Sequence, residues 1–375
     1  MAIHLTYGGS TAARTLACPG WVKKAEGIPK RPAGDAAITG SMLHEVMERC
    51  QREEVEPKQC LGLEYREDNV VRVFGEDDLE LAEIAYAATN RLLDELDIET
   101  FEIEPFVQLE PGLAGGSIDL IGLSADKQTL LVLDYKFGRG RVSVKDNKQL
   151  KLYTVSAEAD PATQDMFAEL ERIVFAVVQP QLWHDAVTWE WENPDLAAFE
   201  ESFREAMGET SINPGPHCKF CPAEPYCDAK RTSVMASNLL GTDLQEELAA
   251  SAAQIEEVEQ WLKAVREEVY LQLSRGVPVE GWKVVNKRAT RKWRDADATM
   301  KALVKTRKLK KSEITKTALM TPAQIEKLLK KKEVNIDLET FIVSESSGTT
   351  LAPESDKREA VIVSDVQGHL ADMMK

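Results

Sequence analysis

Two apolar runs near the middle of the chain predict a pair of neighbouring buried strands. They cover residues 115–121 and 130–136, and the turn-like residues 124–127 separate them. Each run contains one aspartate, Asp119 in the first and Asp134 in the second. We expect the two strands to form a hairpin at the centre of a sheet.

Other segments show either helical or strand periodicity. A helix is expected to begin at residues 40–48, with His44 in its first turn, and further helices are expected at 77–97, 145–159 and 195–207. Strands are expected at 172–180 and 186–191. Helices and strands alternate along this part of the chain, which predicts a mixed α/β fold with a central sheet flanked by helices.

The pattern changes after residue 235. Residues 244–273 are acidic, amphipathic and free of Gly and Pro, which predicts one long helix. A strand at 281–285 and helices at 296–307 and 321–332 follow. We therefore divide the chain into a first domain (1–235), a long acidic helix (236–275), a basic module (276–343) and a flexible tail (344–375).

The charge is distributed unevenly along these parts. The 375 residues carry a formal net charge of −17, yet residues 283–332 contain 17 Lys and Arg against 4 Asp and Glu. Such a basic segment is typical of proteins that contact the phosphate backbone of DNA. The alternative is a solvated basic helix face that balances the acidic helix.

The two aspartates suggest a catalytic site. A carboxylate within an apolar strand is costly unless it is paired or binds a cation, and Lys136 lies on the same strand face as Asp134 because side chains alternate. Two carboxylates and a lysine suit a divalent metal ion and an attacked phosphodiester. The alternative is an exposed ion pair at the end of a strand.

A histidine upstream and a helix downstream favour the catalytic interpretation. His44 lies on the expected helix, while Gln149 and Tyr153 are four residues apart and share one helix face. In this order, the set resembles the RecB-like branch of the PD-(D/E)xK nucleases. The resemblance implies that His44, Asp119 and Asp134 bind Mg²⁺ or Mn²⁺, that Lys136 is catalytic, and that the other two residues are accessory.

Four of the six cysteines form a second candidate site, which would bind a metal. Cys218, Cys221 and Cys227 are clustered, and Cys18, far upstream, is the candidate for a fourth ligand. Four thiolates suit either structural zinc or an iron–sulfur cluster, and spacing alone does not decide between them. RecB-like nucleases of the AddB type have the same division into one and three cysteines, and this resemblance implies a [4Fe–4S] cluster. Cys50 is expected to be an ordinary thiol, as is Cys60.

Short motifs along nearly the whole chain resemble RecB-like proteins encoded by bacteriophages and prophages. They include residues 134–140, 147–153, 179–180 and 353–358. The resemblance implies a DNA exonuclease acting in phage replication or recombination, with a single-strand-binding or annealing protein as a further expected partner. The alternative is a DNA-binding or scaffolding protein that has a nuclease fold without useful catalysis.

The compartment follows from two features of the sequence. No signal peptide is recognisable, and no apolar run approaches the roughly 20 residues of a membrane span. Unpaired thiols and a cluster fit a reducing cytoplasm, which would be that of the host bacterium for a phage protein.

Overall fold

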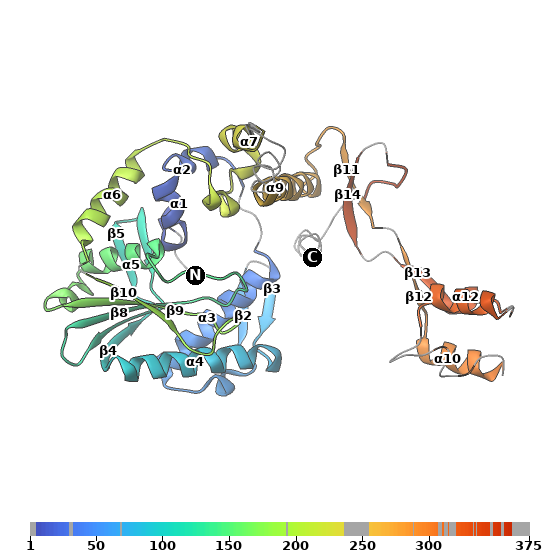
Figure 1. Ribbon diagram of the computed structural model, residues 1–375, viewed down its shortest axis with the longest axis horizontal. Coiled ribbons are helices and arrows are strands. Elements are labelled where there is room, and N and C mark those ends of the chain that lie inside the picture. The colour runs from blue at the N-terminus through green and yellow to red at the C-terminus, as the bar shows by residue number, and fades with distance from the viewer. Residues whose placement is uncertain are drawn as a thin grey trace, which may run out of the picture. The chain divides into compact units, whose positions relative to one another are not determined.

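The structure is a computed structural model. It describes residues 5–29, 33–67, 70–192, 194–235, 255–287, 289–306, 310, 314, 320–332, 334, 336–345, 348–353 and 356–361. The chain divides into two compact units, Met1–Val265 and Arg266–Lys375, and each is described by itself (Figure 1).

Unit 1 is built around a five-stranded mixed sheet with the strand order β10-β9-β8-β7-β4. Strands β8 and β9 are parallel, and the other neighbouring pairs are antiparallel. The expected hairpin is confirmed in part, because the two central strands pair with Leu120 opposite Leu133. The first apolar run is not one strand: its beginning belongs to β6 (Ala114–Ser117) of another sheet, and Asp119 lies between β6 and β7. The strands are β4 (Ile98–Ile103), β7 (Leu120–Ser124), β8 (Thr129–Tyr135), β9 (Arg172–Val178) and β10 (Val187–Trp191).

Helices cover both faces of this sheet (Figure 1). Alternate residues of β8 point to opposite faces, so Leu131 and Leu133 join the core formed with α3 (Asp35–Glu53) and α4 (Glu76–Glu95). Leu130 and Val132 join the core on the other side, which includes residues of α5 (Lys148–Ala159) and contacts α6 (Leu196–Gly208). Burial on both faces explains why the central strands read as continuous apolar runs.

The other elements of unit 1 surround this core. A three-stranded sheet has the order β1-β6-β5, and β2 pairs with β3. These strands are β1 (Tyr7–Gly8), β2 (Glu64–Glu67), β3 (Val70–Val73), β5 (Phe106–Glu110) and β6 (Ala114–Ser117). The short helices are η1 (Gly9–Thr11), α1 (Ala12–Ala17), α2 (Trp21–Ala25), η2 (Pro57–Cys60), η3 (Gln164–Phe167), η4 (Pro216–Phe220), η5 (Glu224–Tyr226) and α7 (Asp228–Met235).

Unit 2 contains two two-stranded sheets and a small core of its own. Strand β11 pairs with β14, and β12 pairs with β13. The core gathers around Leu303, Ile325 and Ile342. Its elements are β11 (Trp282–Asn286), β12 (Thr290–Trp293), α10 (Ala296–Lys305), α12 (Pro322–Lys331), η6 (Glu339–Phe341), β13 (Ile342–Glu345) and β14 (Thr349–Pro353). Helix α9 (Ile255–Ser274) contains the boundary between the units.

Two further expectations about local structure need correction. Helix α3 begins at Asp35, so His44 lies in its middle and not in its first turn; Gly40 is accommodated inside the helix. Part of the tail expected to be flexible forms a strand, since Thr349–Pro353 pairs with Trp282–Asn286. Residues 244–254 of the expected long helix lie outside the described residues.

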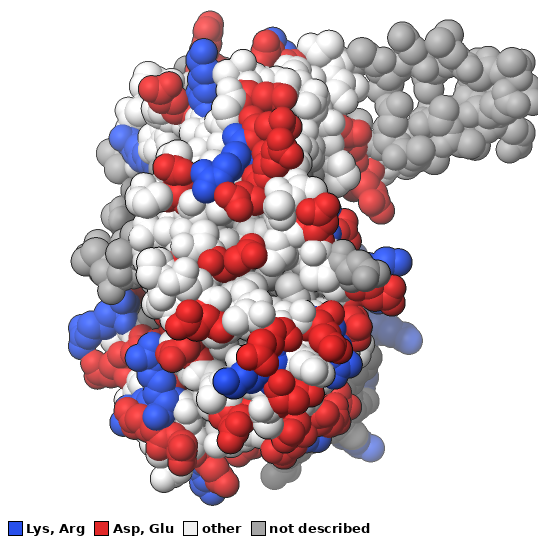
Figure 2. Space-filling model, turned by 90° about the vertical axis from the view of Figure 1, so that its left-hand side faces the viewer, with Lys and Arg blue, Asp and Glu red and all other residues white. Residues whose placement is uncertain are grey.

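The described helices share one further property. None of them combines the length and the apolar character that a membrane crossing requires. Figure 2 shows one face of the molecule on which acidic side chains gather, in agreement with the net charge of −17.

Candidate functional site

The first half of the candidate site joins a helix to the start of the central hairpin. Helix α3 presents His44, whose Nδ1 lies 3.0 Å from Oδ1 of Asp119. Asp119 directly precedes β7, and its Oδ2 accepts a hydrogen bond from the backbone N–H of Tyr135 on the paired strand. The His44 ring also packs edge-on against the ring of Phe137, with centroids 5.3 Å apart. These contacts fix the orientation of the imidazole.

The second half of the site joins the end of β8 to α5. Nζ of Lys136 lies 2.6 Å from Oδ2 of Asp134 and 3.3 Å from Oε1 of Gln149. Nε2 of Gln149 donates to Oδ1 of Asp134 at 2.7 Å, and it lies 3.1 Å from the hydroxyl of Tyr153. The structure therefore brings together all six residues that the sequence predicted for this site.

The backbone around Tyr153 leaves no room for substitution. A Cβ added to Gly9 would lie 2.4 Å from Cε1 of Tyr153, much closer than real Cβ contacts. Gly116 also faces this ring and has φ +153°, a conformation that glycine adopts readily. Close packing by two glycines holds the tyrosine, and through it Gln149, in place.

Glu104 is a site residue that the sequence did not reveal. It follows β4, has a left-handed φ of 51°, and donates its backbone N–H to the carbonyl of Asp119 at 3.2 Å. Its carboxyl group lies close to that of Asp119. Side-chain ligand atoms of His44, Glu104 and Asp119 all lie within 4.8 Å of one another, so these three residues could hold a metal ion.

The only sequence signal for Glu104 was weak. It is one of several glutamates along residues 99–110, and nothing in the pattern separates it from Glu99, Glu102 or Glu110. The left-handed residue before Pro105 is what turns its side chain toward the site, and single sequences do not show such conformations.

The charges at the site are strongly coupled. Burial raises the pKa of Glu104 to about 8, and the neighbouring Asp119 carboxylate acts in the same direction. Burial would also raise the pKa of Asp119, but the charge and hydrogen bond of His44 outweigh it and hold this pKa below its ordinary value. Two carboxyl groups facing each other in a largely buried place favour either a shared proton or a cation between them.

The neighbouring carboxylates also shift the pKa of Lys136. Burial would lower its pKa, but the carboxylates of Asp134 and Asp119 outweigh burial and raise the pKa above its ordinary value. The ammonium group is therefore charged at neutral pH. It can donate hydrogen bonds to a water molecule or to a phosphate oxygen, but it does not remove a proton in this state.

The four predicted cysteines also come together. Cys18 follows α1, Cys218 lies in η4, and Cys221 and Cys227 follow η4 and η5; all four line one small cavity. Backbone N–H groups lie close to three of the sulfurs, at 3.3 Å (Asn213 to Cys18), 3.4 Å (Gly215 to Cys218) and 3.5 Å (Lys230 to Cys227). Donors of this kind are typical around metal-bound thiolates.

The spacing of the four sulfurs can be compared with that of a zinc site. In tetrahedral zinc sites the Zn–S bonds of about 2.3 Å place the sulfurs about 3.8 Å apart. Among the described residues, no three cysteine sulfurs lie within 4.8 Å of one another. The four sulfurs of this structure are therefore spread more widely than the ligands of a bound zinc ion.

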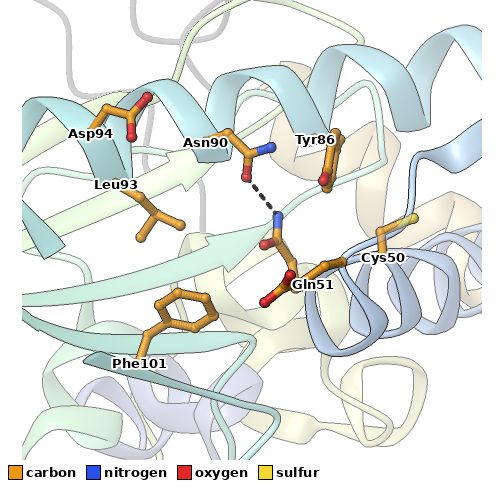
Figure 3. Close-up of a pocket in the computed structure, with 8 residues that line it drawn as sticks. Cys50, Gln51, Tyr86, Asn90, Leu93, Asp94 and Phe101 are labelled. Carbon is orange, nitrogen blue, oxygen red and sulfur yellow. Dashed lines mark hydrogen bonds between the residues drawn. The ribbon is translucent and has the colours of Figure 1, made fainter. Parts of the chain in front are cut away.

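The other two cysteines have no part in this cavity. Cys50 on α3 and Cys60 on η2 are buried in the core, with their sulfurs 3.8 Å apart. Cys50 also borders a separate hollow of about 210 Å³ between α3, α4 and β4, where Gln51 donates a hydrogen bond to Asn90 (Figure 3). This hollow contains none of the residues predicted for either site.

The basic module lies in unit 2. Lys292 and Arg294 are exposed there, as are Lys301 and Lys305 on α10 and Lys330 near the end of α12. Of the predicted basic stretch 307–311, only Lys310 lies within the described residues. Exposed cations on several elements are compatible with contacts to phosphate groups.

Comparison with known proteins gives a family and two distant structures. A family model described as "Protein of unknown function (DUF2800)" matches residues 4–359. A structure described as "Crystal structure of SSO0001" is 14% identical, covers 58% of this chain and 96% of that chain, and has a TM-score of 0.25. "Crystal structure of protein VC1899 from Vibrio cholerae" is 11% identical, covers 54% of this chain and 59% of that chain, and has a TM-score of 0.18.

Proposed function

The chain belongs to the DUF2800 family, whose description states no activity, and we propose from the site itself that it is a metal-dependent deoxyribonuclease of the RecB-like PD-(D/E)xK type. The observation that carries this proposal is the convergence of His44, Asp119, Asp134 and Lys136 at the end of the central hairpin. A mixed sheet with helices on both faces agrees with it.

The residues divide into metal ligands and groups that act on the substrate. His44, Asp119 and Asp134 would hold Mg²⁺ or Mn²⁺, and Glu104 would be a further ligand because it shares the cluster with the first two. A bound divalent ion lowers the pKa of water and neutralises charge on the phosphate in the transition state. The chain's part is to fix these oxygen and nitrogen ligands in a buried place.

The protonated Lys136 would position the attacking water and stabilise the phosphate. Its charge is stabilised by Asp134, and the lysine side chain is about 27% exposed. Gln149 forms hydrogen bonds with both Lys136 and Asp134, so it would fix their positions relative to each other. Tyr153 accepts a hydrogen bond from Gln149 and would in turn fix the orientation of its amide. Positioning of this kind contributes a large share of catalysis in phosphoryl transfer.

The cysteine cavity gives separate support to the RecB-like assignment. We propose that Cys18, Cys218, Cys221 and Cys227 bind a [4Fe–4S] cluster. The wide separation of the sulfurs is compatible with this group, and the division into one and three cysteines resembles that of AddB-type nucleases. Such a cluster would fasten α1 to the segment after α6, about 200 residues later, and so close the domain.

The substrate is proposed to be DNA ends processed during phage replication or recombination. The face in Figure 2 is acidic and would repel phosphates, so DNA is expected to approach elsewhere, with help from the basic side chains of unit 2. A single-strand-binding or annealing protein would be the partner that receives the product strand.

The test is cleavage of end-labelled DNA with Mg²⁺ or Mn²⁺ by anaerobically purified protein. Asp134→Ala should abolish cleavage, while Lys136→Ala should lower the turnover and leave metal binding largely intact. Cys50→Ser, a buried thiol outside both sites, is the matched control. DNA binding without any cleavage by the wild-type protein would instead favour a scaffolding role.

A further inference from the structure

A buried arginine faces the cysteine cavity. Arg14 lies on α1, one turn before Cys18, and is only 8% exposed. It lines the same small cavity as all four cysteines. Neither the candidate nuclease site nor the cysteine ligand set explains why a charged side chain is buried here.

The neutral contacts of Arg14 hold the guanidinium in place but do not balance its charge. Its Nη2 donates a hydrogen bond to the backbone carbonyl of Phe220 at 2.6 Å, and the guanidinium carbon lies 4.7 Å from the centroid of the Trp21 ring. Its Nε is buried and has no hydrogen-bond partner among the described residues. Within the described part of the chain, no carboxylate forms an ion pair with it.

A buried cation without a counter-anion is costly, so an anionic partner is expected. Burial lowers the pKa of Arg14 below its ordinary value, and the ionised forms of Cys221, Cys218 and Cys18 act in the opposite direction. An ordinary set of neutral thiols would not supply this charge. Four thiolates around a metal–sulfide core would, because such a group has a net negative charge.

We propose that Arg14 is the counter-cation of the metal–thiolate group held by the four cysteines, with its free Nε–H directed to that group. This rests on the cluster assigned under the proposed function. Arg14 is a positioning residue, because it acts by balancing charge and does not contact a nucleic-acid substrate.

The charge of Arg14 would influence the midpoint potential of the cluster. Adding one electron makes the cluster more negative, and a nearby positive charge favours that state. Removal of the Arg14 charge should therefore shift the midpoint potential to more negative values. A neighbouring cation that points to solvent should have little effect, because water screens its charge.

The experiment uses the full chain, purified and reconstituted with iron and sulfide under anaerobic conditions. Iron content and the midpoint potential, from an electrochemical titration followed by absorbance, are measured for wild type, Arg14→Gln, Arg14→Lys and Lys24→Gln. Lys24 is the matched control. It borders the same cavity, but its ammonium group pairs with the exposed Asp228 at 2.5 Å.

In Arg14→Gln, the ratio of reduced to oxidised cluster at the wild-type midpoint should fall about tenfold, which is a shift of about 59 mV for one electron. Arg14→Lys should retain most of the wild-type potential, and Lys24→Gln should be unchanged. If Arg14→Gln does not retain iron but Arg14→Lys does, the requirement for charge is supported equally.

Two results would overturn the proposal. One is iron loading and potentials in both Arg14 variants that equal those of wild type. The other is loss of iron from both variants, since this would show that the shape of the guanidinium matters and not its charge. Wild-type protein that binds no iron would refute the cluster itself and leave the nuclease assignment to its own assay.

Discussion

Replacing Asp119 with Asn should remove the stabilisation that Mg²⁺ or Mn²⁺ gives to the folded protein. Ligand atoms of His44, Glu104 and Asp119 lie within 4.8 Å of one another without a metal. Oxygen ligands on opposite sides of Mg²⁺ are about 4.2 Å apart, since each lies about 2.1 Å from the ion. Ligands at adjacent positions of the octahedron are about 3.0 Å apart, so the three side chains would have to approach one another by up to about 1.8 Å on binding.

The size of the effect follows from binding to the folded state alone. At a metal concentration of 100 times Kd, the free energy of unfolding rises by about 2.7 kcal/mol. For a domain of 150–250 residues, 1 kcal/mol shifts Tm by about 2–4 °C, so the expected rise is about 5–11 °C. Asn retains the shape of Asp but has no charge for the metal, so most of this rise should be lost.

The assay is thermal unfolding of EDTA-treated protein titrated with Mn²⁺ or Mg²⁺. Asp94→Asn is the matched control, because Asp94 borders the separate hollow in Figure 3 and has no role in the site. It should show the full metal-dependent rise in Tm. A rise in Asp119→Asn equal to that of wild type would refute the assignment of Asp119 as a metal ligand.

Three further outcomes are expected. The first concerns pH: in metal-free protein, the free energy of unfolding should fall as pH rises from about 4.5 to about 8. Folding raises the pKa of Glu104 from 4.5 to about 8, so the folded protein binds this proton more tightly than the unfolded chain does. Glu104→Gln should flatten this slope in urea unfolding at a series of pH values, and an unchanged slope would contradict the reasoning. Cys18→Ser should lower the iron content of anaerobic protein whereas Cys50→Ser should not; equal iron contents would argue against Cys18 as a ligand. Neutralising Lys292 and Arg294 should reduce the salt dependence of DNA binding by up to about 1.8 units of log K per log unit of salt, and an unchanged slope would place the DNA contacts elsewhere.

The sequence alone was sufficient to predict the centre of unit 1. The apolar runs of β7 and β8 could be recognised because both strands are buried on both faces. The six residues from His44 to Tyr153 were predicted as one site, and the structure brings them together. Spacing relates Asp134 to Lys136 and Gln149 to Tyr153, because one strand or one helix fixes the relative directions of its side chains. The roles of the full set came from its resemblance to RecB-like nucleases.

Local boundaries were less predictable. Helix α3 begins at Asp35, before the glycine at residue 40, because packing of the helix against the sheet outweighs the weak preference of one glycine against helix. Strand β14 formed in a segment whose composition suggested a flexible tail, because β11 supplies its backbone partners. Pairing between strands about 60 residues apart is not encoded in either segment by itself.

Only the tertiary structure could identify Glu104 and Arg14 as members of the two sites. Glu104 is one glutamate among several, and a left-handed backbone turn brings it to Asp119. Arg14 is one cation among many, and the packing of α1 against η4 buries it beside Cys18 and Cys218. The sequence determined which chemical groups were available and on which strand or helix they lay. Burial and proximity, which set the charge balance of each site, arise from contacts between distant segments and were decided by the fold.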